Sequence, residues 1–222
     1  MMLPFTFWWD RIGGLLEPEL LNLDALIASK DVAIDIGANI GLYTYAFAKR
    51  FRRVYAFEIN DEITGLISNY GFGNVELIQC GLSSETREAS FYVPVAGGFA
   101  LAGWGSLNRN NLPGAERVVE KKVSLKPLDD FDIPGVSFIK IDVEGHEVEV
   151  LQGAAKTINN FRPIVLAELK SENVGTVDAR FMTLNYKHFR LEDFVNAHGS
   201  EANHIFVPVE RLAELNMAGR RH

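Results

Sequence analysis

The stretch DVAIDIGANIGLYTYAFAKR, residues 31–50, decides the fold of this chain. Residues 32–36 form an apolar run typical of a buried strand, and residues 43–49 have the apolar spacing of a helix. The turn between them carries almost no side-chain bulk and contains Gly37, Ala38, Asn39 and Gly41. A strand, such a turn and a helix N-terminus together leave backbone N–H groups facing outward, which suits a polar or anionic small ligand.

The composition fits one well-packed domain. Of 222 residues, 47% are hydrophobic and 23% are charged, which is enough apolar material for a sizeable core. The formal net charge of −7 argues against a broad nucleic-acid-binding surface, because such surfaces need clustered lysine and arginine. The basic run KRFRR, residues 49–53, ends the first expected helix, where cations interact favourably with the helix C-terminus. We favour that interpretation over an RNA-binding patch.

Cysteine content and hydropathy indicate the compartment. Cys80 is the sole cysteine, so no internal disulfide can form, and we expect a reducing, cytoplasmic environment. No apolar stretch approaches the length of a membrane span, and residues 1–10 lack the basic region of a signal peptide. We therefore expect no membrane association, and we expect residues 1–30 to form a helical cover over the core or a pocket.

Near-continuous apolar strands alternate with amphipathic helices along the chain. Strands are expected at residues 32–36, 54–58, 75–80, 137–143 and 163–169, and helices at 17–29, 41–50, 61–69, 146–160 and 177–185. This alternation is typical of a parallel α/β sheet covered on both faces. Two further strands flank the polar turn NAHGSEAN, residues 196–203, and can pair as an antiparallel hairpin. We expect a three-layer, doubly wound, Rossmann-like sheet within a single domain, residues 1–222.

A glycine-rich segment, PVAGGFALAGWGSLNRNNLPG at residues 94–114, lies between strands expected at 88–93 and 121–125. Loops of this length are usually functional or disordered. We expect residues 94–122 to form a lid over the acceptor pocket. In that lid Trp104 would give an apolar wall, while Ser106 and Asn108 would offer hydrogen bonds to the substrate.

The glycine turn does not fit the dinucleotide fingerprint, because Asn39 and Leu42 stand where glycines are required. Small residues instead follow Asp35, whose carboxylate would repel a pyrophosphate but can pair with a cationic amine. Glu58 ends the second strand, where a carboxylate can accept hydrogen bonds from both ribose hydroxyls. A ligand with a ribose, an amine and no phosphate is S-adenosylmethionine. The alternative is a tight structural turn capped by Asn39, with Glu58 merely solvated.

Several motifs resemble FkbM-type methyltransferases, a class I family that depends on S-adenosylmethionine: DIGANIGLYT, FEIN, LSSETREASFYV, PLDDF, IKIDVEGHEVEVLQGA and RPIVLAEL. The similarity covers roughly residues 31–169, and IDVEGHE is its most specific part. It implies a seven-stranded fold and O-methylation of a hydroxyl, often on a sugar, glycan or polyketide. Ile59 stands where a proline is frequent, which changes the loop at the ribose. We expect the cofactor-binding residues to be Asp35, Gly37, Ala38, Asn39, Gly41, Glu58, Ile59, Gly81 and Asp142.

A second group of polar residues follows the strand at 137–143. Asp142 ends that strand, Glu144 and His146 lie on the turn into a helix, and Glu168 ends the next strand. A hydroxyl acceptor becomes a good nucleophile only when its proton is accepted, which a carboxylate or imidazole can do. We expect these four residues to be catalytic, with Asp142 the least dispensable.

Other roles for the same residues remain open. Asp142, Glu144 and Glu168 could bind a divalent metal such as magnesium, but their spacing has no distinctive metal signature, so we favour base catalysis without a metal. His146 could instead be a helix-start residue facing solvent. The carboxylates could also have a purely structural role, in which they cap the helix N-terminus and interact favourably with its dipole.

The sequence thus predicts an O-methyltransferase acting on a small hydroxylated acceptor. One alternative is an RNA 2′-hydroxyl methyltransferase, but the acidic charge and the lack of interleaved basic and aromatic residues argue against it. Another is a non-catalytic module that binds S-adenosylmethionine and regulates a partner. No nucleic-acid or membrane partner is expected.

Overall fold

The structure is a computed structural model that describes residues 16–112 and 114–219. Half of the expected N-terminal cover therefore lies outside the described residues. The helix expected at 17–29 is shorter than predicted: α2 spans Pro18–Leu21 and is followed by a 3₁₀ turn at Leu23–Ala25. Asn22 ends α2, because its side-chain Nδ2 donates to the Pro18 carbonyl in competition with the helix backbone.

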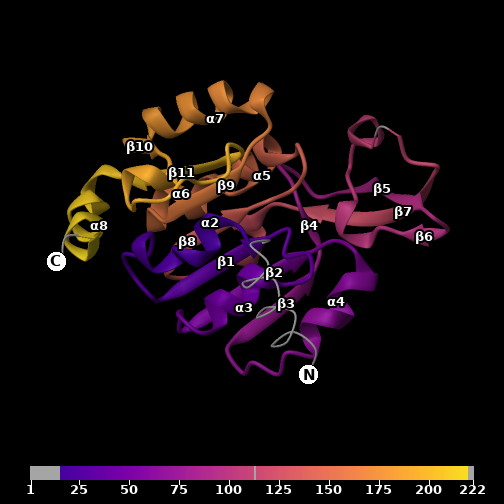
Figure 1. The fold of residues 1–222 in the computed structure, drawn as a ribbon, viewed down its shortest axis with the longest axis horizontal. Coiled ribbons are helices and arrows are strands. Elements are labelled where there is room, and N and C mark those ends of the chain that lie inside the picture. The colour runs from indigo at the N-terminus through magenta and orange to yellow at the C-terminus, as the bar shows by residue number, and fades with distance from the viewer. Residues whose placement is uncertain (1–15, 113, 220–222) are drawn as a thin grey trace.

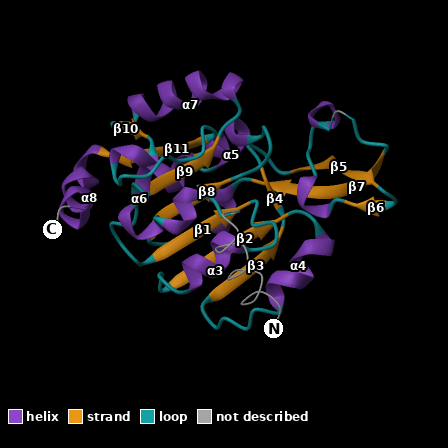
Figure 2. Cartoon of the chain, in the orientation of Figure 1, coloured by secondary structure: helices purple, strands orange, loops and turns teal. Residues whose placement is uncertain are grey.

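A seven-stranded sheet forms the centre of the molecule (Figures 1 and 2). Its strands are β1 (Val32–Ile36), β2 (Arg53–Glu58), β3 (Val75–Gln79), β8 (Val136–Ile141), β9 (Ile164–Glu168), β10 (Tyr186–Phe189) and β11 (Asn203–Pro208). They are ordered β10-β11-β9-β8-β1-β2-β3, and β11 runs antiparallel to both neighbours while the other pairs are parallel. The predicted Rossmann-like fold and its C-terminal antiparallel hairpin are confirmed.

Helices cover both faces of this sheet. They are α3 (Leu42–Ala48), α4 (Asp61–Ser68), α5 (Glu147–Gly153), α6 (Ala155–Phe161), α7 (Ser171–Thr183) and α8 (Leu212–Gly219). One apolar core joins the sheet to α5, α6 and α7, and a second joins its other face to α2, α3 and α8. Figure 1 shows α7 and α3 on opposite sides of the sheet. The chain order of strands reverses between β1 and β8, so ligands are expected at the carboxyl ends of these strands.

The helix expected at residues 146–160 is two helices, α5 and α6, separated by the non-helical backbone of Ala154 (φ −106°, ψ 13°). Gly153 packs against another chain segment at this break, where a Cβ atom would lie 1.9 Å from the Ser83 carbonyl oxygen. The helix predicted at 177–185 starts six residues earlier, at Ser171.

A second, four-stranded sheet stands beside the first; its two long strands were expected at residues 88–93 and 121–125, but their pairing into a separate sheet was not predicted. It consists of β4 (Gly81–Leu82), β5 (Arg87–Ala96), β6 (Phe99–Ala100) and β7 (Arg117–Lys126), ordered β4-β7-β5-β6. In Figure 1 the β5–β7 ribbon projects from one end of the main sheet. The lid boundaries of 94–122 are therefore too wide, because both ends are regular strand.

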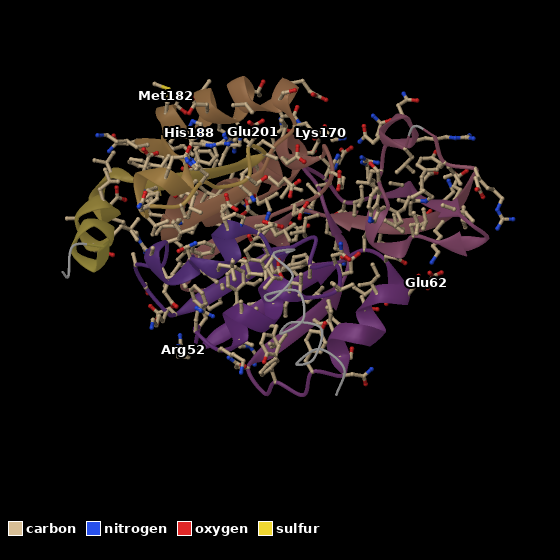
Figure 3. The ribbon with its side chains drawn as sticks, in the orientation of Figure 1. Arg52, Glu62, Lys170, Met182, His188 and Glu201 are labelled. Carbon is tan, nitrogen blue, oxygen red and sulfur yellow. The ribbon has the colours of Figure 1, made fainter. Side chains whose placement is uncertain are left out.

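The ribbon is attached to the main sheet through α4. The Lys121 ammonium lies 2.8 Å from a carboxylate oxygen of Asp61 and 2.8 Å from one of Glu62, and Figure 3 shows Glu62 on the ribbon side of α4. Within the described part of the chain, no helix combines the length and apolar character that crossing a bilayer requires.

Candidate functional site

A pocket with an empty volume of about 730 Å³ opens at the carboxyl ends of β1, β2 and β8. Six of the predicted cofactor-binding residues line it: Gly37, Asn39, Glu58, Ile59, Gly81 and Asp142. Apolar side chains, among them Phe57, Leu82 and Phe91, form much of the remaining wall.

The glycine turn is packed directly against the end of β8. Gly37 has a φ of +79°, and a Cβ atom there would lie 1.8 Å from the Asp142 carbonyl oxygen. Gly37 and Ala38 both donate backbone N–H bonds of 3.0 Å to the Phe57 carbonyl, and Asp142 donates one of 2.9 Å to Ile36. Backbone contact among three strands therefore fixes the floor of the pocket and leaves no room for a side chain at position 37.

Glu58 is held by backbone donors on both oxygens. Its Oε2 accepts from the Asn39 N–H at 2.7 Å and its Oε1 from the Asn60 N–H at 2.8 Å. Burial raises the pKa of Glu58, and these N–H groups act in the opposite direction. Each carboxylate oxygen can accept more than one hydrogen bond, so Glu58 is still able to receive ribose hydroxyls. The solvated alternative for Glu58 is wrong, because its side chain is buried.

Asn39 adds an unsatisfied acceptor to this pocket. Its Nδ2 donates to the Gly103 carbonyl at 3.2 Å, whereas its Oδ1 is buried without a partner. Buried acceptors normally have a hydrogen-bond partner. The unpaired Asn39 Oδ1 therefore fits a nucleoside ligand that carries hydrogen-bond donors. The residues present are thus compatible with the predicted cofactor.

Asp35 is not part of this pocket, which corrects its predicted contact with a ligand amine. Side chains alternate along a strand; Ile36 lines the pocket, so Asp35 faces α3 instead, and its carboxylate accepts from the Thr44 hydroxyl at 2.5 Å. Burial raises the pKa of Asp35 to about 7. Ala38 and Gly41 shape the turn but do not form the pocket wall, and Gly41 (φ +83°) immediately precedes α3.

Beyond Asp142 lies a second cavity with an empty volume of about 420 Å³. Asp142 and Glu144 line both cavities, and Glu168 and Lys170 line the second. Figure 3 shows Lys170 close to the start of α7. The structure therefore brings three of the four predicted catalytic residues to the border between two adjoining cavities.

Glu17 joins this group and was missed by the sequence analysis. Carboxylate oxygens of Glu17, Asp142 and Glu168 lie within 4.8 Å of one another. The Tyr43 hydroxyl and the Asn203 amide hold Glu17 in place by donating to its Oε2 at 2.8 and 2.9 Å. No local pattern marks Glu17, because only the tertiary fold brings it to this edge.

Burial raises the pKa of Glu168 to about 7, and the negative charge of Asp142 adds to that effect. The pKa of Glu144 is raised for the same two reasons. A carboxyl group with a pKa near neutrality is suited to accept and return a proton. Glu168 is therefore a stronger candidate base than its sequence context alone indicated.

His146 faces the first pocket, which excludes the solvent-facing alternative. Its side chain is 13% exposed, Nε2 lies 3.0 Å from the Ser83 hydroxyl, and Nδ1 lies 3.5 Å from Glu149. Burial lowers the pKa of His146, so its neutral form is favoured near pH 7.

The segment after β6 closes over the first pocket and is fixed at two points. At the first point, the Gly103 carbonyl accepts from the Asn39 amide. At the second, the Asn111 amide donates to the Glu144 carbonyl at 2.7 Å and to the Ser106 hydroxyl at 3.1 Å. Ser106 lines this first pocket and not the second cavity, so its predicted hydrogen bond to the acceptor stays a prediction. The segment thus connects the glycine turn to the turn after β8.

The predicted contacts of Trp104 and Asn108 are wrong in this structure. Gly103 and Gly105 lie against the pocket, so the side chain of Trp104 between them points outward and is 70% exposed. Asn108 caps the 3₁₀ turn at Arg109–Asn111 by accepting from the Asn110 N–H at 3.0 Å. Sequence pattern could not give the direction of these side chains.

The carboxylates at the border of the cavities differ from the set considered as a metal site in the sequence. The clustered carboxylates are those of Glu17, Asp142 and Glu168, rather than the expected set with Glu144. The buried ammonium of Lys140 lies 3.8 Å from Asp142 Oδ2, so one positive charge is already present beside this cluster.

Residues 35–202 match the sequence model described as the methyltransferase FkbM domain. The chain belongs to the FkbM methyltransferase family. Hexuronic acid methyltransferase AglP of Haloferax volcanii is 29% identical over 176 residues, which are 74% of this chain and 69% of AglP. Methyltransferase 1 of Beauveria bassiana is 28% identical over 141 residues, 54% of this chain and 57% of that protein.

A solved FkbM methyltransferase from Methylobacillus flagellatus shares the fold. It superposes with a TM-score of 0.56 at 17% identity and covers 81% of this chain, which corresponds to 43% of the other chain. This likeness shows the shared fold, and the match of residues 35–202 to the FkbM domain confirms the predicted methyltransferase family.

Proposed function

We propose that this FkbM-family protein is an S-adenosylmethionine-dependent O-methyltransferase of a small hydroxylated acceptor, with a sugar or glycan as the leading class and a polyketide alcohol as the next. The observation that carries the proposal is the pair of adjoining cavities that share Asp142 and Glu144. One has the polar and apolar wall that a nucleoside needs, and the other is lined by carboxylates that can handle a hydroxyl proton.

The first cavity would hold the cofactor. Glu58 would accept the ribose hydroxyls, Asn39 would use its unpartnered Oδ1, and the apolar residues Phe57, Ile59 and Leu82 would pack against the adenosine. Gly37 keeps the floor free of side chains. When bound, S-adenosylmethionine supplies an electrophilic methyl group, whose transfer to an oxygen leaves the C–S electron pair on sulfur.

The second cavity would hold the acceptor. Its hydroxyl would point toward Asp142, where the two cavities meet, and its proton would pass to Asp142 or Glu168. General bases of this kind contribute on the order of 10²–10⁴-fold to rate. The Glu168 carboxyl is suited to that step because its pKa lies at about 7.

The choice of acceptor class rests on two arguments. Carboxylate oxygens bind hydroxyl groups well, and AglP, a relative at 29% identity, is named for methylating a hexuronic acid. The net charge of −7 speaks against a nucleic-acid acceptor. These arguments favour a small hydroxylated molecule over RNA as the acceptor.

The test is formation of S-adenosylhomocysteine by the purified protein across a panel of sugars, nucleotide-sugars and polyketide alcohols. We expect acceptor-dependent turnover with at least one hydroxylated compound, and at least 100-fold less with Asp142→Asn at saturating cofactor. Cofactor binding without turnover on any member would favour the regulatory-module alternative. Turnover on structured RNA alone would contradict the acceptor class. Loss of wild-type turnover with a chelator would show that a metal is required.

A further inference from the structure

Lys140 is the penultimate residue of the buried strand β8, and its side chain is only 1% exposed. Its neighbour Phe138 points to the same face and packs in the core beneath α3. A buried ammonium is unfavourable unless it is paired and hydrogen-bonded. The groups around Lys140 must therefore compensate the cost of burying its charge.

The ammonium of Lys140 is directed at the border between the two cavities. Its Nζ lies 3.8 Å from Asp142 Oδ2 and donates to Asn203 Oδ1 at 3.4 Å. It also lies 5.1 Å from the centre of the Tyr43 ring, an additional favourable contact for a cation.

The same neighbours fix the carboxylate cluster. Asn203 accepts from the Lys140 ammonium at its Oδ1 and donates from its Nδ2 to Glu17 Oε2. The Tyr43 hydroxyl donates to the same oxygen of Glu17. Asn203 is also the register partner of Glu168 across β11 and β9. One hydrogen-bond network therefore links the ammonium to the carboxylate cluster.

Four carboxylates interact with the charge of Lys140, and they come from different elements. They are Asp35 from β1 (its register partner), Asp142 after β8, Glu144 on the following turn and Glu168 from β9. The carboxylate of Glu17 is linked to Lys140 through Asn203, and the Tyr43 ring of α3 also faces the ammonium. The nearby cation Lys170 acts on Glu144. The carboxylates thus outnumber the cations, so removal of one ammonium changes the charge balance of the whole border.

We propose that Lys140 is a positioning residue for methyl transfer, whose buried ammonium orients Asp142 and the carboxylates beside it so that one of them can take the proton of the acceptor hydroxyl. This inference rests on the proposed function. Lys140 does not touch the acceptor. The positive charge lowers the pKa of Glu168 against the larger opposing effects of burial and Asp142.

The test compares Lys140→Met with Lys140→Arg, which keeps the charge, and with the exposed Lys156→Met as a control for the same chemical change. The Glu168 carboxyl is followed by ¹³C NMR in protein with labelled glutamate. We expect Lys140→Met to move its titration midpoint upward by about one pH unit or more, and the other two variants to leave it near the wild-type value. The acidic limb of the rate profile, kcat against pH, should move in the same direction.

An unchanged midpoint and an unchanged acidic limb in folded Lys140→Met, with only a uniform loss of rate, would show a packing role and overturn the proposal. If that variant does not fold, the ¹⁵N signal of the Lys140 amine in wild-type protein decides. An ammonium that persists to pH 9 supports the proposal, and a neutral amine at pH 7 refutes it. The NMR titrations need no turnover, so a failure of the proposed function is distinguishable from a failure of this inference.

Discussion

Substitution of Gly37 by alanine is the perturbation whose effect the geometry defines best. A Cβ atom at this position would lie 1.8 Å from the backbone oxygen of Asp142, whereas ordinary contact begins at 3.4 Å, so the two turns must separate by 1.6 Å. A positive φ costs an alanine about 1–2 kcal/mol, and overpacking against rigid backbone costs about 1–3 kcal/mol more. We expect the free energy of unfolding to fall by about 2–5 kcal/mol.

Gly71→Ala is the matched control. Gly71 also has a positive φ, +69°, but an added Cβ atom would meet nothing within 4 Å. Its expected cost is therefore the conformational part alone, about 1–2 kcal/mol. The unfolding free energies of the two variants in urea therefore separate the cost of the positive φ from the cost of the contact between the added Cβ atom and Asp142.

Displacement of the Gly37 turn should also affect function. A misplacement of about 1 Å can cost on the order of 100-fold in rate, so Gly37→Ala should lose turnover and cofactor affinity while Gly71→Ala keeps both. Equal destabilisation of the two variants, together with normal cofactor affinity in Gly37→Ala, would refute the packing argument.

Three other predictions follow from the site. Glu58→Ala should weaken S-adenosylmethionine binding by about 1–3 kcal/mol in calorimetry, whereas Glu76→Ala, which removes only a surface pair, should not; equal affinities would contradict the ribose assignment. The folded-state pKa of Asp35 is raised from 3.8 to about 7, so the folded state binds the extra proton and this group's contribution to stability falls as pH rises from about 4 to 7. Unfolding free energies of wild type and Asp35→Asn should therefore diverge across that window, and parallel curves would argue against it. Asn111→Ala removes the 2.7 Å bond to the Glu144 carbonyl and should raise KM more than it lowers kcat; unchanged kinetics would mean that the closure of this segment is irrelevant.

Much of the main sheet could be predicted from the sequence because its strands are buried on both faces. Continuous apolar runs such as residues 32–36 and 163–169 lead directly to parallel strands. The second sheet could not be predicted, because strand β4 has only two residues and pairs with β7, more than thirty positions later. The break between α5 and α6 likewise depends on a tertiary contact of Gly153.

A site residue could be predicted where its position at the end of a strand is enough to place it in the pocket. It could not be predicted where its role depends on the direction of its side chain or on contact with a distant part of the chain. Glu58 and Asp142 end parallel strands, so their place at one edge follows from the topology. Asp35 was misassigned because strand alternation turns it toward α3. Lys140, its register partner, was overlooked because a lysine within an apolar strand has no local signature of its function. Glu17 reaches the cluster only through tertiary folding.

The most direct test of the central claim is to follow the methyl group itself. Wild-type protein is incubated with methyl-¹³C S-adenosylmethionine and the acceptor found in the panel, and the product is analysed by NMR. The account predicts a single ¹³C-methoxy signal on the acceptor that is lost with Asp142→Asn, although that variant still binds the cofactor. Label on nitrogen or carbon, or equal label with Asp142→Asn, would contradict the assignment of O-methyl transfer at the Asp142 edge.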